Sequence, residues 1–201
     1  MRATVIDYKA GNLTSVLKAL RHLGVETIVT DGDLSLVDSA ERIVLPGVGH
    51  FAATARLDST GLTQAIRSAI ARGVPFLGIC VGMQWLYAGS TEAPEQPGLG
   101  QFPEQCVRFM ESTEKVPHVG WNSLDVRKDS RLLKGVARGE FVYFTHSYKG
   151  PVTADTSAVT CYIEPFAAAV ERESVMGVQF HPEKSGETGL KILRNFLEIP
   201  C

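Results

Sequence analysis

The sequence has few cysteines, and they lie far apart. The four are Cys80, Cys106, Cys161 and Cys201, so none belongs to a closely spaced pair of the zinc-binding kind. A disulfide framework is not expected in a chain of 201 residues with an ordinary composition. We therefore expect reduced thiols and a cytoplasmic protein.

Long apolar runs and an excess of one charge are also missing. No stretch approaches the ~20 apolar residues of a membrane span, and Met1 to Asp7 lacks the apolar region of a signal peptide. With 20 basic and 22 acidic residues the net charge is -2, which favours neither nucleic acid nor an anionic membrane as partner. The glycine patterns that bind phosphates or dinucleotides are absent too. A composition of 44% hydrophobic and 21% charged residues predicts one folded domain over residues 1–201.

The first 80 residues alternate short apolar runs with helical patterns. Asn12 is placed to cap the first helix, Gly24 and Gly73 to end helices, and Pro46 to end a strand. Repeated strand–helix units predict an α/β domain with a central, mostly parallel sheet flanked by helices. The carboxyl ends of such strands share one edge, where ligands bind. We expect strands at 4–6, 26–30, 42–45 and 74–79, and helices at 13–23 and 62–70.

The second half contains more strand patterns and fewer helical ones. We expect a helical segment from Cys80 to Leu86, a surface loop over residues 89–103 and a last amphipathic helix over 189–197. The intervening strands are expected to form antiparallel additions and return strands of the same domain. They are predicted at 105–110, 139–145, 158–162, 167–170 and 175–180.

The segment Gly78-Ile79-Cys80-Val81-Gly82 carries the sharpest chemical signal. It follows an apolar strand and precedes a helix, as in the turn that presents a nucleophile, here with cysteine in place of serine. Flanking glycines allow the chain to fold back tightly, and a helix N-terminus favours a thiolate. An isolated cysteine is more often a small buried apolar residue. The surrounding pattern favours a nucleophile.

A second signal lies in Gly177-Val178-Gln179-Phe180-His181-Pro182-Glu183. His181 follows a predicted strand, so it and Cys80 both lie at strand ends of one sheet. Glu183 can orient His181 and stabilise its imidazolium. A surface turn with ordinary polar residues is the alternative, which the neighbouring cysteine motif makes the weaker one.

The segment Pro46-Gly47-Val48-Gly49 also follows a strand. Its two glycines allow the backbone to approach a ligand and to present N–H groups to an oxyanion. Taken alone the signal is weak, because turn-forming residues are common in loops.

These three segments together resemble the class I glutamine amidotransferases, in the family's order. A narrower resemblance rests on five further segments: Asp7-Tyr8, Gly11-Asn12-Leu13, Val116 to Asn122, Phe144 to Tyr148, and Gln179 to Ser185. These segments are similar to the glutaminase subunits of imidazole glycerol phosphate synthases, which serve histidine biosynthesis. Lys9 departs from that pattern, where glycine is usual.

The resemblance implies a glutaminase with the triad Cys80, His181 and Glu183. Cys80 would attack the side-chain amide of glutamine, and His181 would protonate the departing nitrogen and then activate water. Backbone N–H groups of Gly47, Val48 and Gly49 and of Val81 would hold the oxyanion. Glutamine itself would lie near Gly49, Gln84, His146, Ser147 and Tyr148.

The resemblance also implies a partner. Ammonia would pass to a separate cyclase subunit with a (β/α)8 barrel fold, the two forming a heterodimer. Asn12, Tyr143 and Lys184 match family positions near the subunit boundary. No cofactor and no metal are implied, so the acceptor chemistry would belong to the other chain.

Three alternatives remain open from the sequence. The chain could be the glutaminase of another synthase, against which the Val48 loop and the segment from Pro117 to Asn122 argue. A stand-alone cysteine hydrolase would show full turnover without a partner. A non-enzymatic module with the same fold would be favoured by a missing triad member, and all three members are present.

Overall fold

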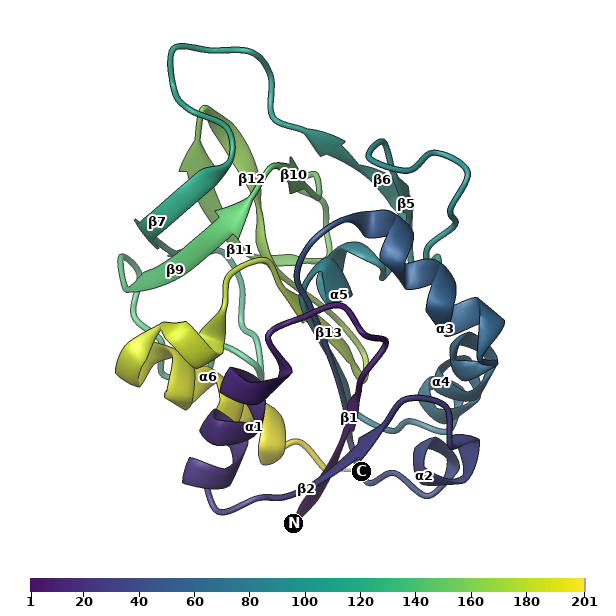
Figure 1. Cartoon of the computed structure of the whole chain (residues 1–201). Helices are drawn as coiled ribbons and strands as arrows, with labels where there is room; N and C mark the ends of the chain where they lie inside the picture. The colour runs from purple at the N-terminus through teal and green to yellow at the C-terminus, as the bar shows by residue number, and fades with distance from the viewer. Residues whose placement is uncertain (201) are drawn as a thin grey trace.

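A central sheet of eight strands organises the computed structural model, which describes residues 1–200 (Figure 1). The strand order is β2-β1-β3-β4-β13-β12-β11-β8, parallel from β2 to β13 and antiparallel from there to β8. This arrangement confirms the predicted α/β class with its antiparallel additions. The strands are β1 (Arg2–Ile6), β2 (Glu26–Thr30), β3 (Ile43–Gly47), β4 (Phe76–Cys80), β8 (Asp125–Val126), β11 (Thr156–Tyr162), β12 (Glu164–Arg172) and β13 (Val175–Val178).

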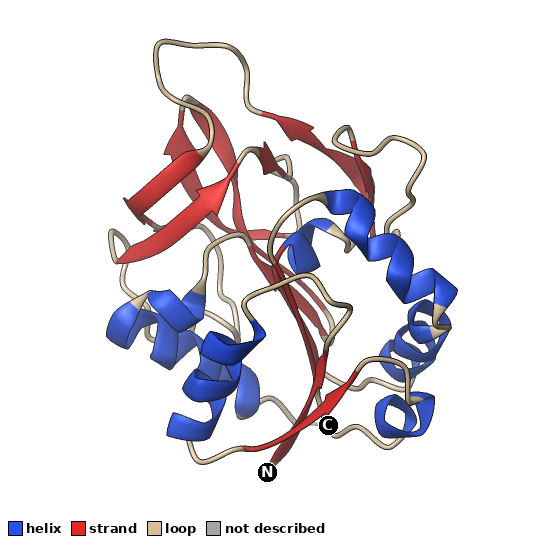
Figure 2. Cartoon of the chain, in the orientation of Figure 1, coloured by secondary structure: helices blue, strands red, loops and turns tan. Residues whose placement is uncertain are grey.

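Helices cover both faces of this sheet (Figure 2). On one side lie α1 (Leu13–His22) and α6 (Gly186–Leu197), and on the other α2 (Leu34–Asp38), α3 (Ala55–Ser59) and α4 (Leu62–Ala71). The long helices are amphipathic, so burial of one apolar stripe holds each against the strands. The buried residues include Val16 and Leu20 of α1, Ile66 of α4, and Leu193 and Phe196 of α6.

Two small sheets and three short helices complete the fold. One sheet joins β5 (Tyr87–Ser90), β6 (Phe102–Arg108) and β10 (Tyr148–Lys149), and the other pairs β7 (His118–Ser123) antiparallel with β9 (Phe141–His146). One face of the β7–β9 pair is buried at His118, Phe144 and His146. The other face of the pair exposes apolar side chains. The short helices are η1 (Phe51–Thr54), α5 (Val81–Gln84) and η2 (Pro182–Lys184).

Pro46 does not end the third strand, contrary to the prediction. β3 runs on through Pro46 to Gly47, which pairs with Cys80 of β4. The ladder between β3 and β1 stops at Val44. At Pro46 there is therefore no β1 partner that needs a hydrogen bond from the backbone. A proline, which lacks the backbone N–H, is tolerated there.

Three further local predictions differ from the structure, two after Cys80 and one at Asn12. The helical segment ends at Gln84 rather than Leu86, because the chain turns at once into β5. The predicted loop over residues 89–103 begins inside β5 and ends inside β6. Asn12 occupies the N-cap position of α1, but its side chain makes no capping hydrogen bond.

The described residues include no helix with the length and apolar character needed to cross a membrane. Cys80, Cys106 and Cys161 are free thiols, as expected, and Cys201 lies outside the described residues.

Candidate active site

Cys80 lies at a strained turn between β4 and α5. Its φ of 54° and ψ of -109° place a non-glycine residue in a sparsely populated region, which costs on the order of 1–3 kcal/mol. A Cβ added at Gly78 would clash with the Gly82 carbonyl, and one at Gly82 with the Leu45 carbonyl. Both glycines are therefore needed, as the sequence predicted. With only four residues, α5 supplies little helix dipole, so a thiolate here needs individual hydrogen-bond donors.

His181 and Glu183 form a buried pair. The distance from His181 Nδ1 to Glu183 Oε1 is 2.9 Å, and each side chain is 1% exposed. Burial opposes a charge on His181, but the nearby sulfur of Cys80 and the hydrogen bond and charge of Glu183 outweigh it and raise the pKa of the imidazole to about 10. His181 Nε2 is buried and makes no hydrogen bond to the described residues. This nitrogen is free to exchange a proton with the sulfur or with a reacting group.

The backbone of His181 is attached to β9. Its N–H donates to the carbonyl of Tyr143 at 2.9 Å, and the Ser185 hydroxyl donates to the His181 carbonyl at 2.7 Å. The Tyr143 N–H in turn donates to Ser185 Oγ at 3.0 Å. A displacement of Tyr143 would therefore move the imidazole.

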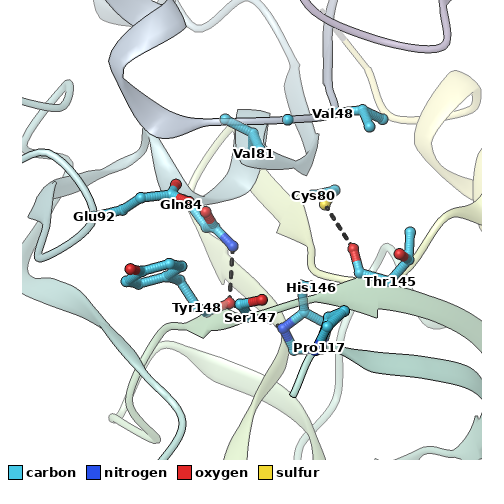
Figure 3. Close-up of a pocket in the computed structure, with 11 residues that line it drawn as sticks. Val48, Cys80, Val81, Gln84, Glu92, Pro117, Thr145, His146, Ser147 and Tyr148 are labelled. Atoms are coloured by element: carbon cyan, nitrogen blue, oxygen red, sulfur yellow. Dashed lines mark hydrogen bonds between the residues drawn. The ribbon is translucent and has the colours of Figure 1, made fainter. Parts of the chain in front are cut away.

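A cavity of about 210 Å³ opens beside Cys80 (Figure 3). Val48 and Val81 lie on one side of the sulfur, and Thr145 with the residues that follow it lies on the other. Of the predicted substrate-binding residues, Gly47 alone does not line this cavity. It is buried, and a Cβ there would clash with the Tyr8 hydroxyl. The lining residues are Val48, Gly49, Cys80, Val81, Gln84, Glu92, Pro117, Thr145, His146, Ser147 and Tyr148.

Three lining residues escaped the sequence reasoning: Glu92, Pro117 and Thr145. Glu92 places a carboxylate on the cavity wall, and its Oε2 accepts a hydrogen bond from the Phe51 N–H at 2.8 Å. Glu92 had no recognisable motif, because it lies in a stretch rich in turn-forming residues. Pro117 and Thr145 lie inside segments that carried the resemblance, but neither was assigned a place in the site.

The loop after β3 has the backbone freedom expected of it. Gly49 has a φ of +102°, a conformation that L residues with side chains rarely adopt, and Val48 is 38% exposed. Tyr8 packs beneath Gly47, and its buried hydroxyl has no described partner. Burial and the charge of Cys80 raise the pKa of this phenol, which therefore stays neutral.

Two of the three predicted boundary residues lie together. Lys184 Nζ is 5.7 Å from the centre of the Tyr143 ring, which meets Trp121 edge-on at 6.2 Å. Val119, Trp121 and Phe141 are each more than half exposed, an unusual set of apolar side chains for a free surface. Asn12 precedes α1, which packs against η2, the helix that contains Lys184.

The conformation and contacts of Lys9 explain how a lysine can stand where the family pattern has glycine. Its φ is 63°, the left-handed conformation that glycine adopts without strain. Lys9 Nζ lies 3.0 Å from Asp7 Oδ2 and 2.9 Å from Asp31 Oδ2, and its N–H donates to Asp7 Oδ1. These contacts hold the loop in a conformation close to the one that glycine would allow.

Comparisons with known proteins agree with this geometry. The family model described as glutamine amidotransferase class-I matches residues 4–199. A protein of Caldanaerobacter subterraneus named imidazole glycerol phosphate synthase subunit HisH is 46% identical, over 97% of this chain and 97% of its own. One of the same name from Aquifex aeolicus is 44% identical, over 98% and 96%.

Solved structures show the same fold. The crystal structure of a glutamine amidotransferase superimposes with a TM-score of 0.77 at 20% identity, covering 98% of this chain and 97% of the other. The structure of PurLQS from Thermotoga maritima gives 0.72 at 24% identity, covering 98% and 97%. At such identities the likeness concerns the fold alone.

Proposed function

The chain belongs to the class I glutamine amidotransferase family, and we propose that it is the glutaminase subunit of an imidazole glycerol phosphate synthase. It hydrolyses glutamine to glutamate and ammonia for a synthase that serves histidine biosynthesis. The observation that carries this proposal is the near full-length likeness to subunits of that name, joined to a buried His181–Glu183 pair beside Cys80.

Catalysis begins with the Cys80 thiolate. It attacks the carbonyl carbon of the glutamine side chain, and the carbonyl electrons move onto oxygen. His181, held as imidazolium by Glu183, gives its proton to the departing nitrogen, so the C–N bond breaks and ammonia leaves. The neutral imidazole then takes a proton from water, which attacks the thioester and releases glutamate and the thiolate.

The oxyanion formed in each step needs N–H donors. The backbone N–H of Val81, the residue after the nucleophile, and those of the loop from Gly47 to Gly49 are the groups that we assign to this role. Val48 and Gly49 line the cavity, whereas Gly47 does not. Loss of one such donor typically costs ~10²–10³ in rate, so a peptide turned the wrong way in this loop would hold the enzyme nearly inactive.

The cavity has groups for the rest of glutamine. Gln84, His146, Ser147 and Tyr148 lie on its wall, as the resemblance implied. Glu92 adds the negative charge that pairs with an α-ammonium group.

The partner in this proposal is a cyclase subunit with a (β/α)8 barrel, bound as a heterodimer in the cytoplasm. The surface assigned to it includes Asn12, Tyr143 and Lys184, with the exposed apolar face of the β7–β9 pair beside them. Direct transfer keeps ammonia from protonation and dilution in bulk water. No cofactor is assigned to this chain.

The test compares two nitrogen sources in the complex with the cyclase subunit. Cys80→Ala is expected to abolish glutamine-dependent synthesis of imidazole glycerol phosphate while synthesis from ammonium salts continues. Equal loss of both activities would make Cys80 a structural residue. Full glutamine hydrolysis by the isolated wild-type chain would favour a stand-alone hydrolase instead.

A further inference from the structure

Gln179 is a buried amide that directly contacts the sulfur of Cys80. It follows β13, whose parallel pairing with β4 sets Val178 beside Ile79, and its side chain is fully buried. Gln179 Nε2 lies 3.6 Å from Cys80 Sγ, and Gln179 Oε1 lies 3.1 Å from Gln84 Nε2. The steps proposed above give this residue no role.

A backbone carbonyl determines which way this amide points. The Tyr148 carbonyl can only accept, so the Gln84 atom 2.9 Å from it must be the NH2 group. The second hydrogen of that NH2 group goes to Gln179, which must therefore present its oxygen to Gln84. The remaining end of Gln179, its NH2 group, then faces the sulfur.

The same carbonyl determines the tautomers of two histidines. His146 Nδ1 lies 2.9 Å from it and must donate, which leaves His146 Nε2 to accept from His118 Nδ1 at 3.1 Å. His118 Nε2 then accepts from the Asn122 amide at 3.4 Å. A single chain of oriented hydrogen bonds thus extends from β7 to the nucleophile.

Besides His181, the sulfur has two polar neighbours, which favour opposite protonation states. Thr145 presents a carbonyl oxygen 3.9 Å away, which can only accept from an S–H group. Gln179 presents an N–H group, which bonds most strongly to a thiolate. When the proton leaves the thiol, the contact with Thr145 is lost and the contact with Gln179 strengthens.

From this geometry we infer that Gln179 is the side-chain donor that stabilises the thiolate of Cys80, and that Gln84 positions it. The inference rests on the proposed function, and the same hydrogen bond assists two steps of that reaction. It stabilises the nucleophile before attack, and it stabilises the sulfur again when water opens the thioester and the C–S electron pair returns to sulfur.

The test measures the sulfur itself. The rate of iodoacetamide alkylation is followed against pH on the isolated chain and is read by mass spectrometry on the peptide that contains Cys80. In Gln179→Met, which has a similar length but no donor, the pH midpoint of alkylation is expected to rise by about one unit. His181 and Tyr8, the titratable side chains whose charges act on Cys80, are unchanged.

Two further variants separate the hydrogen bond from packing. Gln179→Leu also lacks the donor but fills space differently, so a similar rise in both variants identifies the donor as the cause. Gln105→Met, at an exposed position of β6, is the matched control and should leave the midpoint unchanged. An unchanged midpoint in whichever Gln179 variant keeps the wild-type circular dichroism spectrum overturns the inference.

Turnover in the complex gives an independent readout. Gln179 is absent from the residues that line the cavity, so Gln179→Met should lower kcat about 10-fold and change KM for glutamine less than 3-fold. A raised KM with an unchanged kcat would assign Gln179 to substrate binding instead. Because alkylation requires neither glutamine nor a partner, absence of glutaminase activity in the wild type would refute the proposed function and leave the midpoint result intact.

Discussion

His181 and Glu183 act through one shared hydrogen bond, and their separate contributions are measurable. His181→Ala removes the only imidazole in the proposed triad, so we expect glutamine hydrolysis by the complex to fall at least ~10³-fold. Glu183→Gln keeps an oxygen that can accept from Nδ1 but loses the charge, so a smaller loss of about 10–100-fold is expected. Ammonia-dependent synthesis is the control for both. Retention of most glutaminase activity by His181→Ala would mean that another residue is the base.

Lys9 permits a comparison of backbone strain with side-chain contacts. Lys9→Ala keeps the left-handed conformation and loses the ion pairs, whereas Lys9→Gly loses the same ion pairs and also the strain. We expect the glycine variant to unfold about 2–4 °C higher than the alanine variant by differential scanning calorimetry. The same Tm in both would show that the loop relaxes when the lysine contacts are removed.

Individual residues were predictable where chemistry and local backbone coincide. Cys80 was identifiable because its flanking glycines are demanded by close backbone contacts at the same turn. Gln179 was not, since a glutamine beside an apolar strand carries no signal until the fold sets it against the sulfur. Glu92 remained hidden for a similar reason, because its place on the cavity wall depends on the tertiary path of its loop.

The paired strands β7 and β9 carry a buried histidine pair that makes stability sensitive to acid. Burial lowers the pKa of His118 to about 4, and burial is also the largest cause that lowers the pKa of His146 to about 3. In the unfolded chain both titrate near 6.5, so the unfolded state binds more protons as the pH falls below that value. Stability from the pair is therefore present above pH 6.5 and lost as the pH falls toward 4.

We expect the Tm to decrease as the pH falls from about 6 to about 4.5, with a smaller slope in His118→Gln, which lacks one of the two titrating rings. His181 contributes little in this range. Its raised pKa stabilises the fold fully below about 6.5, and that stability is lost as the pH rises from there toward 10. An equal slope in wild type and variant would show that other groups cause the acid sensitivity.

The strands and long helices of the first half were predictable, although the short helices α2, η1 and α3 were missed, and prediction was poorer after Cys80. In the first half apolar runs and helical stripes have the lengths of buried strands and surface helices. Beyond residue 84, β8 and β10 have two residues each, and β6 and β7 are largely exposed or half-buried. β7 has alternating polar and exposed apolar residues because one face contacts solvent. Burial across the final fold, rather than local sequence, determines where such strands begin and end.

For the whole molecule, the attachment of Tyr143 to His181 suggests how a partner would be sensed. Lys184 and Tyr143 contact each other at the proposed boundary, and the Tyr143 carbonyl holds the His181 N–H. We expect the isolated chain to be a poor glutaminase, and the complex with cyclase ligand to be much faster. Steady-state glutamine hydrolysis by the chain, the complex and the liganded complex measures this. Three similar rates would contradict it.

Lys184→Ala should reduce that activation by about 10-fold, because one contact between the proposed boundary and the proposed triad is removed. Lys128→Ala is the matched control, since its ammonium group bonds only the Ala154 carbonyl among the hydrogen bonds described for residues 1–200. An equal effect of the two substitutions would indicate a general influence of positive charge. Full activation of Lys184→Ala would remove this lysine from the coupling.

The two tryptophans of the chain differ strongly in solvent exposure. Trp85 is fully buried, whereas Trp121 is 55% exposed on the apolar face of the β7–β9 pair. In the separated chain, acrylamide would quench the fluorescence of Trp121 and leave that of Trp85 nearly untouched. A partner seated on this face would shield Trp121 and shift its emission to shorter wavelength, so the unlabelled protein carries its own optical reporter of assembly.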